Sequence, residues 1–220
     1  GEAALSNWDA GMDMYIYGKL GNLIMTKEGI NVLMTNLTGK VPPILQRLDY
    51  IRFNGEAAGY LHDLTLTGLF HTGAGMVKTD VMMSIDEQSM SRTYSGSVAS
   101  ADLDLGKLLN QEKKFGKVDF NVELKGFNYK NRYPESYIKG IISSFEYSQY
   151  QYENIMLDGV YKDGGFNGRL SMDDANGSVQ IDGNFNVAKT IPDFNLKASV
   201  KNLRPHDLHL SDKYETGPHC

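Results

Sequence analysis

Apolar and polar residues alternate with a period of two along most of this chain, and no other feature constrains its fold as much. Every second residue from Val118 to Leu124 is apolar, whereas the residues between them are Asp119, Asn121 and Glu123. A strand with this pattern buries one face and leaves the other in water, which is typical of antiparallel sheets. The same alternation recurs in residues 64–70, 77–85, 166–173, 179–187 and 194–201.

Short turn sequences separate the alternating segments. They are rich in glycine, asparagine, aspartate and proline, as in residues 72–75, 163–165 and 174–177. Connections this short join antiparallel neighbours, so the sequence predicts an all-β meander of roughly a dozen strands. Helix is expected only as short inserts at residues 42–48 and 105–113. Neither insert is long enough to cover such a sheet, so the sheet must cover itself.

Several predicted strands contain a glycine at a position that the alternation assigns to the apolar face. A glycine within a strand lowers its stability and usually marks a sharp bend or the close approach of another surface. We therefore predict that each strand bends at its glycine and that the sheet curls into an elongated, taco-shaped groove with an apolar interior. The glycines expected at these bends are Gly68, Gly126, Gly159, Gly168 and Gly183.

Charge and cysteine content exclude several classes of protein. The chain has 27 acidic and 22 basic residues and a net charge of −5, and no cluster of lysine and arginine suggests nucleic-acid binding. Its single cysteine, Cys220, leaves no internal disulfide framework and no cysteine-rich zinc site. No apolar run reaches the roughly 18 residues that a membrane-spanning helix requires.

The sequence contains no motif for a nucleophile, a phosphate-binding loop or a metal centre, so we predict a protein that is not an enzyme and uses no cofactor or metal. His206 and His209 are three positions apart, but no third ligand has a fitting spacing. The run from Asp173 to Gly177 is faintly similar to a calcium loop. It lacks the closing glutamate, and we interpret it as a hairpin turn.

We interpret residues 1–210 as one continuous segment of β-groove from a longer protein, and residues 211–220 as a disordered tail. The chain begins with Gly1 and Glu2 rather than with a methionine or a signal-like segment. We therefore expect any membrane anchor to lie outside this segment. A meander taken from a longer stack has an unpaired strand at each end, so edge-to-edge self-association is also expected.

One stretch of the chain carries a family resemblance. Residues 147–174 read YSQYQYENIMLDGVYKDGGFNGRLSMDD, and they resemble the TamB-type members of the AsmA-like family of bridge-like lipid transfer proteins in the bacterial envelope. The shared features are a tyrosine-rich lead-in, an Asn-Ile-x-Leu-x-Gly strand, a glycine turn, Phe-x-Gly and a turn that contains aspartate. Residues 53–85 and 99–127 are similar in style, so the resemblance covers most of residues 50–205.

The resemblance implies a translocation and assembly module that is anchored in the inner membrane and spans the periplasm of a Gram-negative bacterium. Such proteins conduct phospholipid between the inner and outer membranes, assist outer-membrane protein assembly together with a barrel protein, or do both. In this chain, phospholipid acyl chains would lie along the apolar face. The residues expected to line that groove are Leu64, Leu66, Phe70, Val81, Met83, Phe120, Val122, Leu124, Ile155, Leu157, Phe166, Leu170, Val179, Ile181, Phe185, Phe194, Leu196 and Val200.

Two other functions stay open. One is a non-catalytic carbohydrate-binding or adhesin β-sandwich, for which exposed aromatic side chains would be the sign. The other is part of an outer-membrane barrel, which short strands with charged residues on one face and no aromatic girdles disfavour. Crowded tyrosines fit either a rim for headgroups or sugars or ordinary strand composition. They are Tyr133, Tyr137, Tyr147, Tyr150, Tyr152 and Tyr161.

Overall fold

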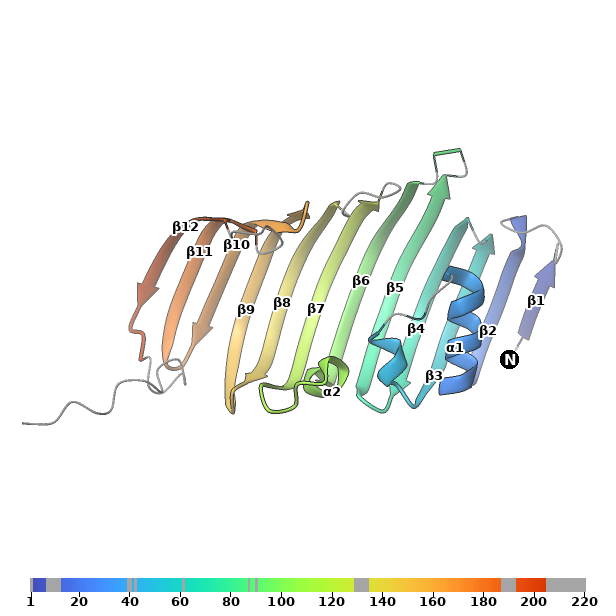
Figure 1. The fold of residues 1–220 in the computed structure, drawn as a ribbon, viewed down its shortest axis with the longest axis horizontal. Coiled ribbons are helices and arrows are strands. Elements are labelled where there is room, and N and C mark those ends of the chain that lie inside the picture. The colour runs from blue at the N-terminus through green and yellow to red at the C-terminus, as the bar shows by residue number, and fades with distance from the viewer. Residues whose placement is uncertain are drawn as a thin grey trace, which may run out of the picture.

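Twelve antiparallel strands form a single sheet in which the strand order follows the chain from β1 to β12 (Figure 1). The computed structural model describes residues 2–6, 13–38, 41, 43–60, 62–86, 88–89, 91–128, 135–186 and 193–204. The predicted all-β meander of hairpins is confirmed, whereas the predicted tail at residues 211–220 lies outside the described residues. The strands are β1 (Glu2–Ser6), β2 (Tyr15–Thr26), β3 (Tyr50–Tyr60), β4 (Asp63–Thr72), β5 (Gly75–Asp86), β6 (Ser91–Asp104), β7 (Phe115–Asn128), β8 (Glu135–Tyr147), β9 (Tyr150–Lys162), β10 (Gly165–Asp174), β11 (Gly177–Asn186) and β12 (Asp193–Lys201).

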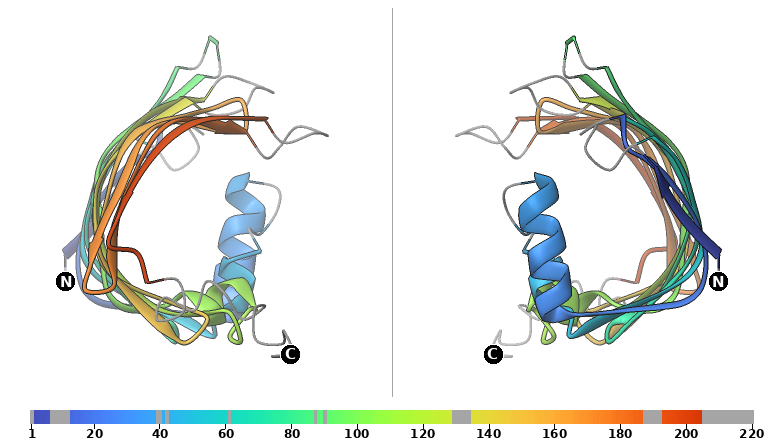
Figure 2. Two further views of the ribbon diagram at one scale, coloured as in Figure 1. Left: turned by 90° about the vertical axis from the view of Figure 1, so that its left-hand side faces the viewer. Right: turned by 90° about the vertical axis from the view of Figure 1, so that its right-hand side faces the viewer.

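The sheet curls into an open, C-shaped cross-section (Figure 2). It does not close on itself, and the edge strands β1 and β12 lie at opposite ends of the long axis (Figure 1). Helix α1 (Lys27–Thr38) rises from one edge of the curl and stands at the open side of the C (Figure 2). An elongated, curled and open sheet is therefore the architecture of this chain.

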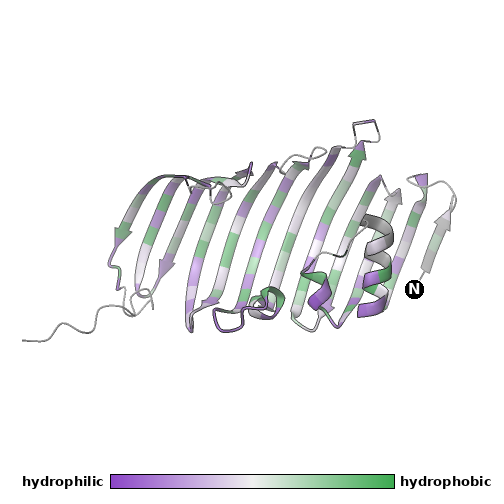
Figure 3. Ribbon diagram, in the orientation of Figure 1, coloured by the Kyte–Doolittle hydropathy of each residue, from purple (hydrophilic) through white to green (hydrophobic). Residues whose placement is uncertain are grey.

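The apolar residues of successive strands share the concave face. Strand register carries them straight across the sheet, so that Leu157 lies opposite Leu170, which in turn lies opposite Ile181. The face is identified as concave because Ile30 of α1 belongs to a core cluster against which Ile51 of β3 packs. Hydrophobic and hydrophilic residues alternate along the strands (Figure 3), so the convex face is the polar one.

Helix α1 was not predicted from the sequence, and that expectation was wrong. Its interior contains Gly29, Asn31 and Val32, which are poor helix formers. The Thr26 hydroxyl accepts a hydrogen bond of 3.5 Å from the Gly29 N–H in the first turn, and Ile30 is only 2% exposed in the core. Packing against the concave face therefore stabilises a helix that local propensity does not favour.

The two predicted helical inserts exist but are shorter than expected. The first is a single 3-10 turn, η2 (Leu45–Arg47). The second is α2 (Leu105–Leu109), where the Asp104 carboxylate accepts a hydrogen bond of 2.8 Å from the Lys107 N–H. Asn110 adopts the left-handed conformation that ends this helix, so residues 110–113 are not helical.

Glycines of neighbouring strands meet on the concave face along a band that we call the glycine band. Gly55 lies opposite Gly68, and Gly168 lies opposite both Gly159 and Gly183. A Cβ on any of them would come within 3 Å of the backbone of the next strand, which only glycine permits. The predicted bend glycines 68, 159, 168 and 183 belong to this band, together with Gly55, Gly96 and Gly140, which sequence analysis did not single out.

Gly126 differs from the other predicted bend glycines. The space beside it is filled by the ring of Tyr94 from the adjacent strand, not by backbone. The Tyr94 hydroxyl then hydrogen-bonds with Ser136 on the far side of the glycine. This glycine therefore makes room for an aromatic side chain that covers it, and the bend expected there stays a prediction.

A row of alternating charges crosses the convex face directly behind the glycine band, and we call it the charge row. The strand register places each acid opposite a base from β7 to β12. Arg169 Nε lies 2.6 Å from Asp182 Oδ1, and Lys139 Nζ lies 3.5 Å from Asp158 Oδ2. Long charged side chains thus occupy the outer side of the curl where the inner side has no side chain. The row consists of Glu123, Lys139, Asp158, Arg169, Asp182 and Lys197.

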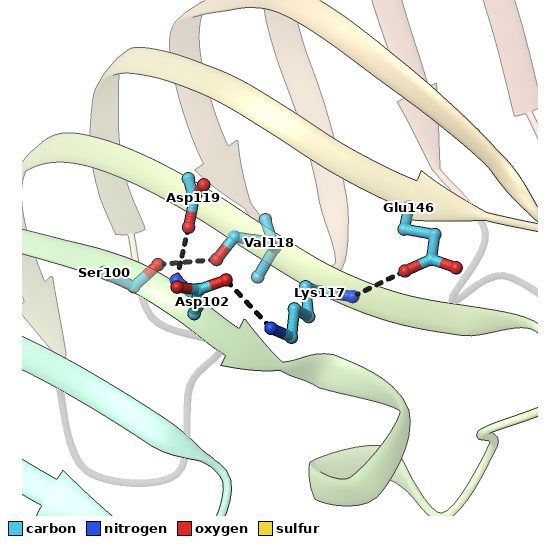
Figure 4. Close-up of polar contacts among 6 residues, drawn as sticks. All are labelled: Ser100, Asp102, Lys117, Val118, Asp119 and Glu146. Atoms are coloured by element: carbon cyan, nitrogen blue, oxygen red, sulfur yellow. Dashed lines mark hydrogen bonds and ion pairs between the residues drawn. The ribbon is translucent and has the colours of Figure 1, made fainter.

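A β-bulge at the end of β6 turns the chain toward α2 (Figure 4). Asp102 adopts φ 55°, its N–H donates to Asp119 Oδ1 at 2.5 Å, and its own carboxylate accepts from Lys117 Nζ at 3.0 Å. This hydrogen bond and the charge of Asp102 raise the pKa of Lys117. The extra residue directs Leu103 onto the concave side, where it is buried beside Val118.

Gly168→Ala should destabilise the fold because the added Cβ would lie 2.4 Å from the Asp158 carbonyl oxygen and 2.5 Å from the Gly159 Cα. We expect a loss of about 1–3 kcal/mol in the free energy of unfolding, measured by urea denaturation. Gly21→Ala is the matched control, since no atom lies within 4 Å of its Cβ position. Equal stability of the two variants would contradict the close packing of strands along the glycine band.

Hydrogen bonds from Gln180 and Arg169 hold the pKa of Asp182 below its ordinary value of 3.8. Gln180→Ala and Arg169→Ala should each raise this pKa in an NMR titration of the side-chain carboxyl. A carboxyl with a lowered pKa stabilises the fold above its unfolded-state pKa. Its contribution is therefore full at neutral pH and is lost as the pH falls through the lowered value. An unchanged Asp182 pKa in both variants would rule out these hydrogen bonds in solution.

Candidate functional site: the concave apolar face

All the residues expected to line a groove lie on the concave face. The strand register connects them on one side of the sheet, from Leu64 in β4 to Val200 in β12. Within this set, Phe70 lies opposite Val77, and Phe166 lies opposite Phe185, with ring centroids 5.8 Å apart. We call this continuous surface the concave apolar face.

The concave apolar face extends beyond the residues that sequence analysis named. Strands β2 and β8 were not among the recognised alternations, because register shifts at residues 20–23 and 142–145 interrupt their period of two. In β3, small residues replace large apolar ones at Gly55, Ala57 and Gly59. Only the strand register recovers these positions. The apolar members outside the predicted lining set are Ile16, Leu20, Leu23, Met25, Ile51, Phe53, Val77, Val98, Val118, Ile138, Ile142, Phe145 and Met172, of which Val77, Val118 and Met172 belong to alternations recognised in the sequence.

Charged residues occur on this face only where the described strands begin or end. Arg92 stands near the start of β6, and Asp174 is the last residue of β10. We call the two long edges of the curled sheet, where the strands begin and end, its lips. Between the lips, the concave positions of the described strands are apolar, glycine or hydroxyl-bearing. A surface of this kind attracts apolar ligands.

The face is covered at one end of the sheet and open at the other. Residues of α1, α2, β6 and β7 form a buried cluster with Leu48, which follows η2, and Ala74, in the turn before β5. Its members are Ile30, Leu48, Ala74, Leu103, Leu108 and Val118. At the other end, the concave side chains of β12 are exposed to solvent, and in β11 Phe185 is exposed while Val179 and Ile181 are half-buried. Phe194 is 60% exposed and Val200 is 50% exposed. An apolar ligand would therefore find its uncovered surface toward β12.

Aromatic rings gather at the lip of the concave face beside the β8–β9 hairpin. Tyr147, Tyr150 and Tyr152 stack with Phe115 and Phe145 at centroid distances of 4.7–6.3 Å. The Tyr150 hydroxyl donates to the Asp174 carboxylate, and desolvation raises the pKa of both Tyr150 and Tyr152. Within this cluster, the Tyr150 hydroxyl is held at the lip by Asp174, the last residue of β10.

The crowded tyrosines do not form one common rim. Tyr161 lies on the concave face toward the opposite lip, because it pairs with Phe166 and Ser136. Tyr137 lies on the convex face, where its hydroxyl donates to Asp158 at 2.9 Å and its pKa is raised by that bond. Tyr133 lies outside the described residues.

Shallow depressions occur on the convex face. Their volumes are about 460 to 510 Å³. One contains Ile141 and Met156, and another contains Met82, Phe127 and Tyr137. Apolar and aromatic side chains therefore also lie among the charges of the polar face, although they do not form a continuous surface.

No group of three or more histidine, cysteine, aspartate or glutamate side chains could hold a metal among the described residues. His206, His209 and Cys220 lie outside that part of the chain. Residues 174–177 form the predicted hairpin turn between β10 and β11, in which the Asp174 carboxylate accepts from the Asn176 N–H at 2.9 Å. Within the described ranges, no helix has the length and apolar character needed to span a membrane.

Comparison with known proteins gives no relative, because no family model, no curated protein and no solved structure matches this chain. The resemblance to TamB-type proteins therefore stays a prediction from the sequence.

The two ends of the concave apolar face should respond differently to loss of an aromatic ring. Phe53 is 5% exposed, whereas Phe194 is 60% exposed. We expect Phe53→Ala to lower the free energy of unfolding by about 3–5 kcal/mol, and Phe194→Ala to lower it by less than about 1 kcal/mol. Urea denaturation of both variants measures the difference. A large loss in Phe194→Ala would mean that the β12 end is covered in solution.

Proposed function

We propose that this chain is a segment of an apolar groove that conducts phospholipid between the inner and outer membranes of a Gram-negative bacterium, without catalysis. The observation that carries the proposal is the concave apolar face, which continues across the sheet and is uncovered toward β12. A soluble protein rarely leaves a large contiguous apolar surface without a ligand or partner. The sequence resemblance to TamB-type proteins supports the same function and a periplasmic location.

The curl suits an amphipathic lipid. Strands are spaced by about 4.8 Å, so the face has a length on the order of 50 Å. Acyl chains would follow the long axis of the face and cross the strands. Headgroups would stay at the open side of the C-shaped cross-section. Successive strands offer equivalent apolar positions, so lipid would slide between sites of similar energy. No proton transfer or covalent step is involved.

A role in outer-membrane protein assembly with a barrel partner belongs to the same proposal. Exposed strand edges and an apolar face could also receive segments of an unfolded protein. The resemblance is the source of this part of the proposal.

Ile181→Asp should remove bound phospholipid while the sheet stays folded. Ile181 lies on the concave face between Leu170 and Ala198, and a carboxylate there would repel acyl chains. Asn184→Asp is the matched control, because it places the same charge on the exposed convex side of the same strand. Native mass spectrometry after purification, or delipidation and reloading with phosphatidylethanolamine vesicles, measures the lipid retained.

We expect several-fold less phospholipid on Ile181→Asp than on the wild type or on Asn184→Asp. Circular dichroism melting checks that the variant is folded. Wild-type lipid content in a folded Ile181→Asp protein would overturn the proposal for this strand. Equal losses in both variants would overturn the assignment of the concave face as the binding surface.

Carbohydrate binding is the alternative function, and exposed aromatic rings on the convex face favour it. Phe127 is 44% exposed and Tyr137 is 38% exposed, and both line one depression. Aromatic faces of this kind pack against sugar rings. Native mass spectrometry also detects bound oligosaccharide. Absence of phospholipid from the wild-type protein, together with loss of oligosaccharide binding in Tyr137→Ala, would support the alternative.

A further inference from the structure

The last strand of the sheet has an open edge. All residues of β12 are exposed to solvent, and among the described residues β12 forms a ladder with β11 alone. Its concave side presents Phe194, Leu196 and Val200, which are 44–60% exposed. An edge strand with exposed apolar side chains is a template for another strand.

The charge row indicates which residue a strand added at the open edge of β12 should carry. Charges alternate in sign from Lys139 through Asp158, Arg169 and Asp182, and the row ends at Lys197 in β12. Directly opposed unlike charges stabilise an antiparallel pair, and like charges destabilise it. The position that would follow Lys197 therefore calls for an acidic residue.

We propose that the free edge of β12 binds an extended polypeptide segment that pairs antiparallel with it, with an acidic residue opposite Lys197. The residues on either side of that acid would be apolar or glycine and would face the concave side beside Leu196 and Ala198. The bound segment would thereby extend both the charge row and the concave apolar face by one strand.

The lysines of β12 make the strand selective. Lys197 and Lys201 both lie on its convex side, and lysine on an edge strand suppresses pairing between like strands. Pairing of β12 with β12 of a second copy would bring these positive charges near one another. An acidic partner strand removes that repulsion. This inference concerns an interaction surface and does not depend on the proposed lipid function.

A peptide with the sequence of residues 177–186 is a suitable probe, because β11 pairs with β12 from the other side and places Asp182 opposite Lys197. The end-blocked, fluorescently labelled peptide is titrated with the 220-residue protein. Lys197→Glu should weaken its binding by roughly fivefold, which is the effect of one exposed ion pair. A peptide with Asp182→Lys should bind the Lys197→Glu protein better than it binds the wild type.

Lys201→Glu is the matched control, because it makes the same charge change on the same strand opposite a serine, Ser178. It should leave peptide binding within about twofold of the wild type. Circular dichroism checks the fold of each variant, and Lys197→Gln replaces Lys197→Glu if the latter is unfolded. Absence of peptide binding, or an equal loss in Lys197→Glu and Lys201→Glu, would overturn the proposal.

Sedimentation of the protein alone distinguishes a second copy from a separate partner. The sequence alone led us to expect edge-to-edge self-association, but Lys197 and Lys201 oppose pairing of β12 with itself, so at the micromolar concentrations of the titration we expect a monomer. Self-association that Lys197→Glu abolishes would show that a second copy occupies the edge, and a separate acidic partner would then be excluded. Loss of phospholipid binding in Ile181→Asp bears on the proposed function alone, so failure of one proposal does not imply failure of the other.

Discussion

Close approach of neighbouring strand backbones along the glycine band is the constraint on which the rest of this structure depends. A sheet can curl toward one face only where that face has space, and Gly168 provides it because a Cβ there would meet the Asp158 carbonyl oxygen. Gly96 and Gly183 add a second reason, since both have φ of 141°, a conformation that other residues rarely adopt. The curl in turn brings the concave side chains close enough to bury one another in part.

On the convex side, charged residues lie next to glycines of the band. In Lys139-Gly140, Asp158-Gly159 and Asp182-Gly183, the residue without a side chain faces inward and its charged neighbour faces outward. Side chains spread apart on the outside of a curl, so long ones can reach their cross-strand partners without crowding. These ion pairs are exposed and individually weak. Their main effect is to select one register, because a slip by two residues would place charges opposite uncharged residues or like charges.

The fold was predictable because alternation is a local property of the sequence. Strands such as β7 and β11 are evident from alternation alone, and short polar turns allow only antiparallel neighbours. Helix α1 was not predictable in this way, because its stability comes from Ile30 packing against residues distant in the sequence. Gly96 and Gly140 could have been found, since they share the parity of their apolar neighbours. The role of Gly126 in making room for the Tyr94 ring could not be predicted, because that ring comes from another strand.

For the candidate site, the sequence predicted which residues share a face but not which of them are covered. Phe53 and Phe194 stand in similar alternating contexts, yet one is buried and the other is exposed. The ring of Phe53 packs against Phe70 and lies over Gly55 and Gly68, whereas Phe194 stands on the edge strand β12. Coverage of that kind depends on tertiary packing and leaves no periodic signal in the strands that it covers.

Strict neighbour pairing also affects how this architecture can change in length. Every strand contacts mainly the strands before and after it in the chain, so the sheet behaves as a one-dimensional stack. Duplication or deletion of a hairpin would preserve strand direction and both faces, whereas gain or loss of a single strand would reverse the direction of all strands that follow. Evolution can therefore adjust the span of such a protein in steps of two strands, or roughly 10 Å, without redesigning its interior.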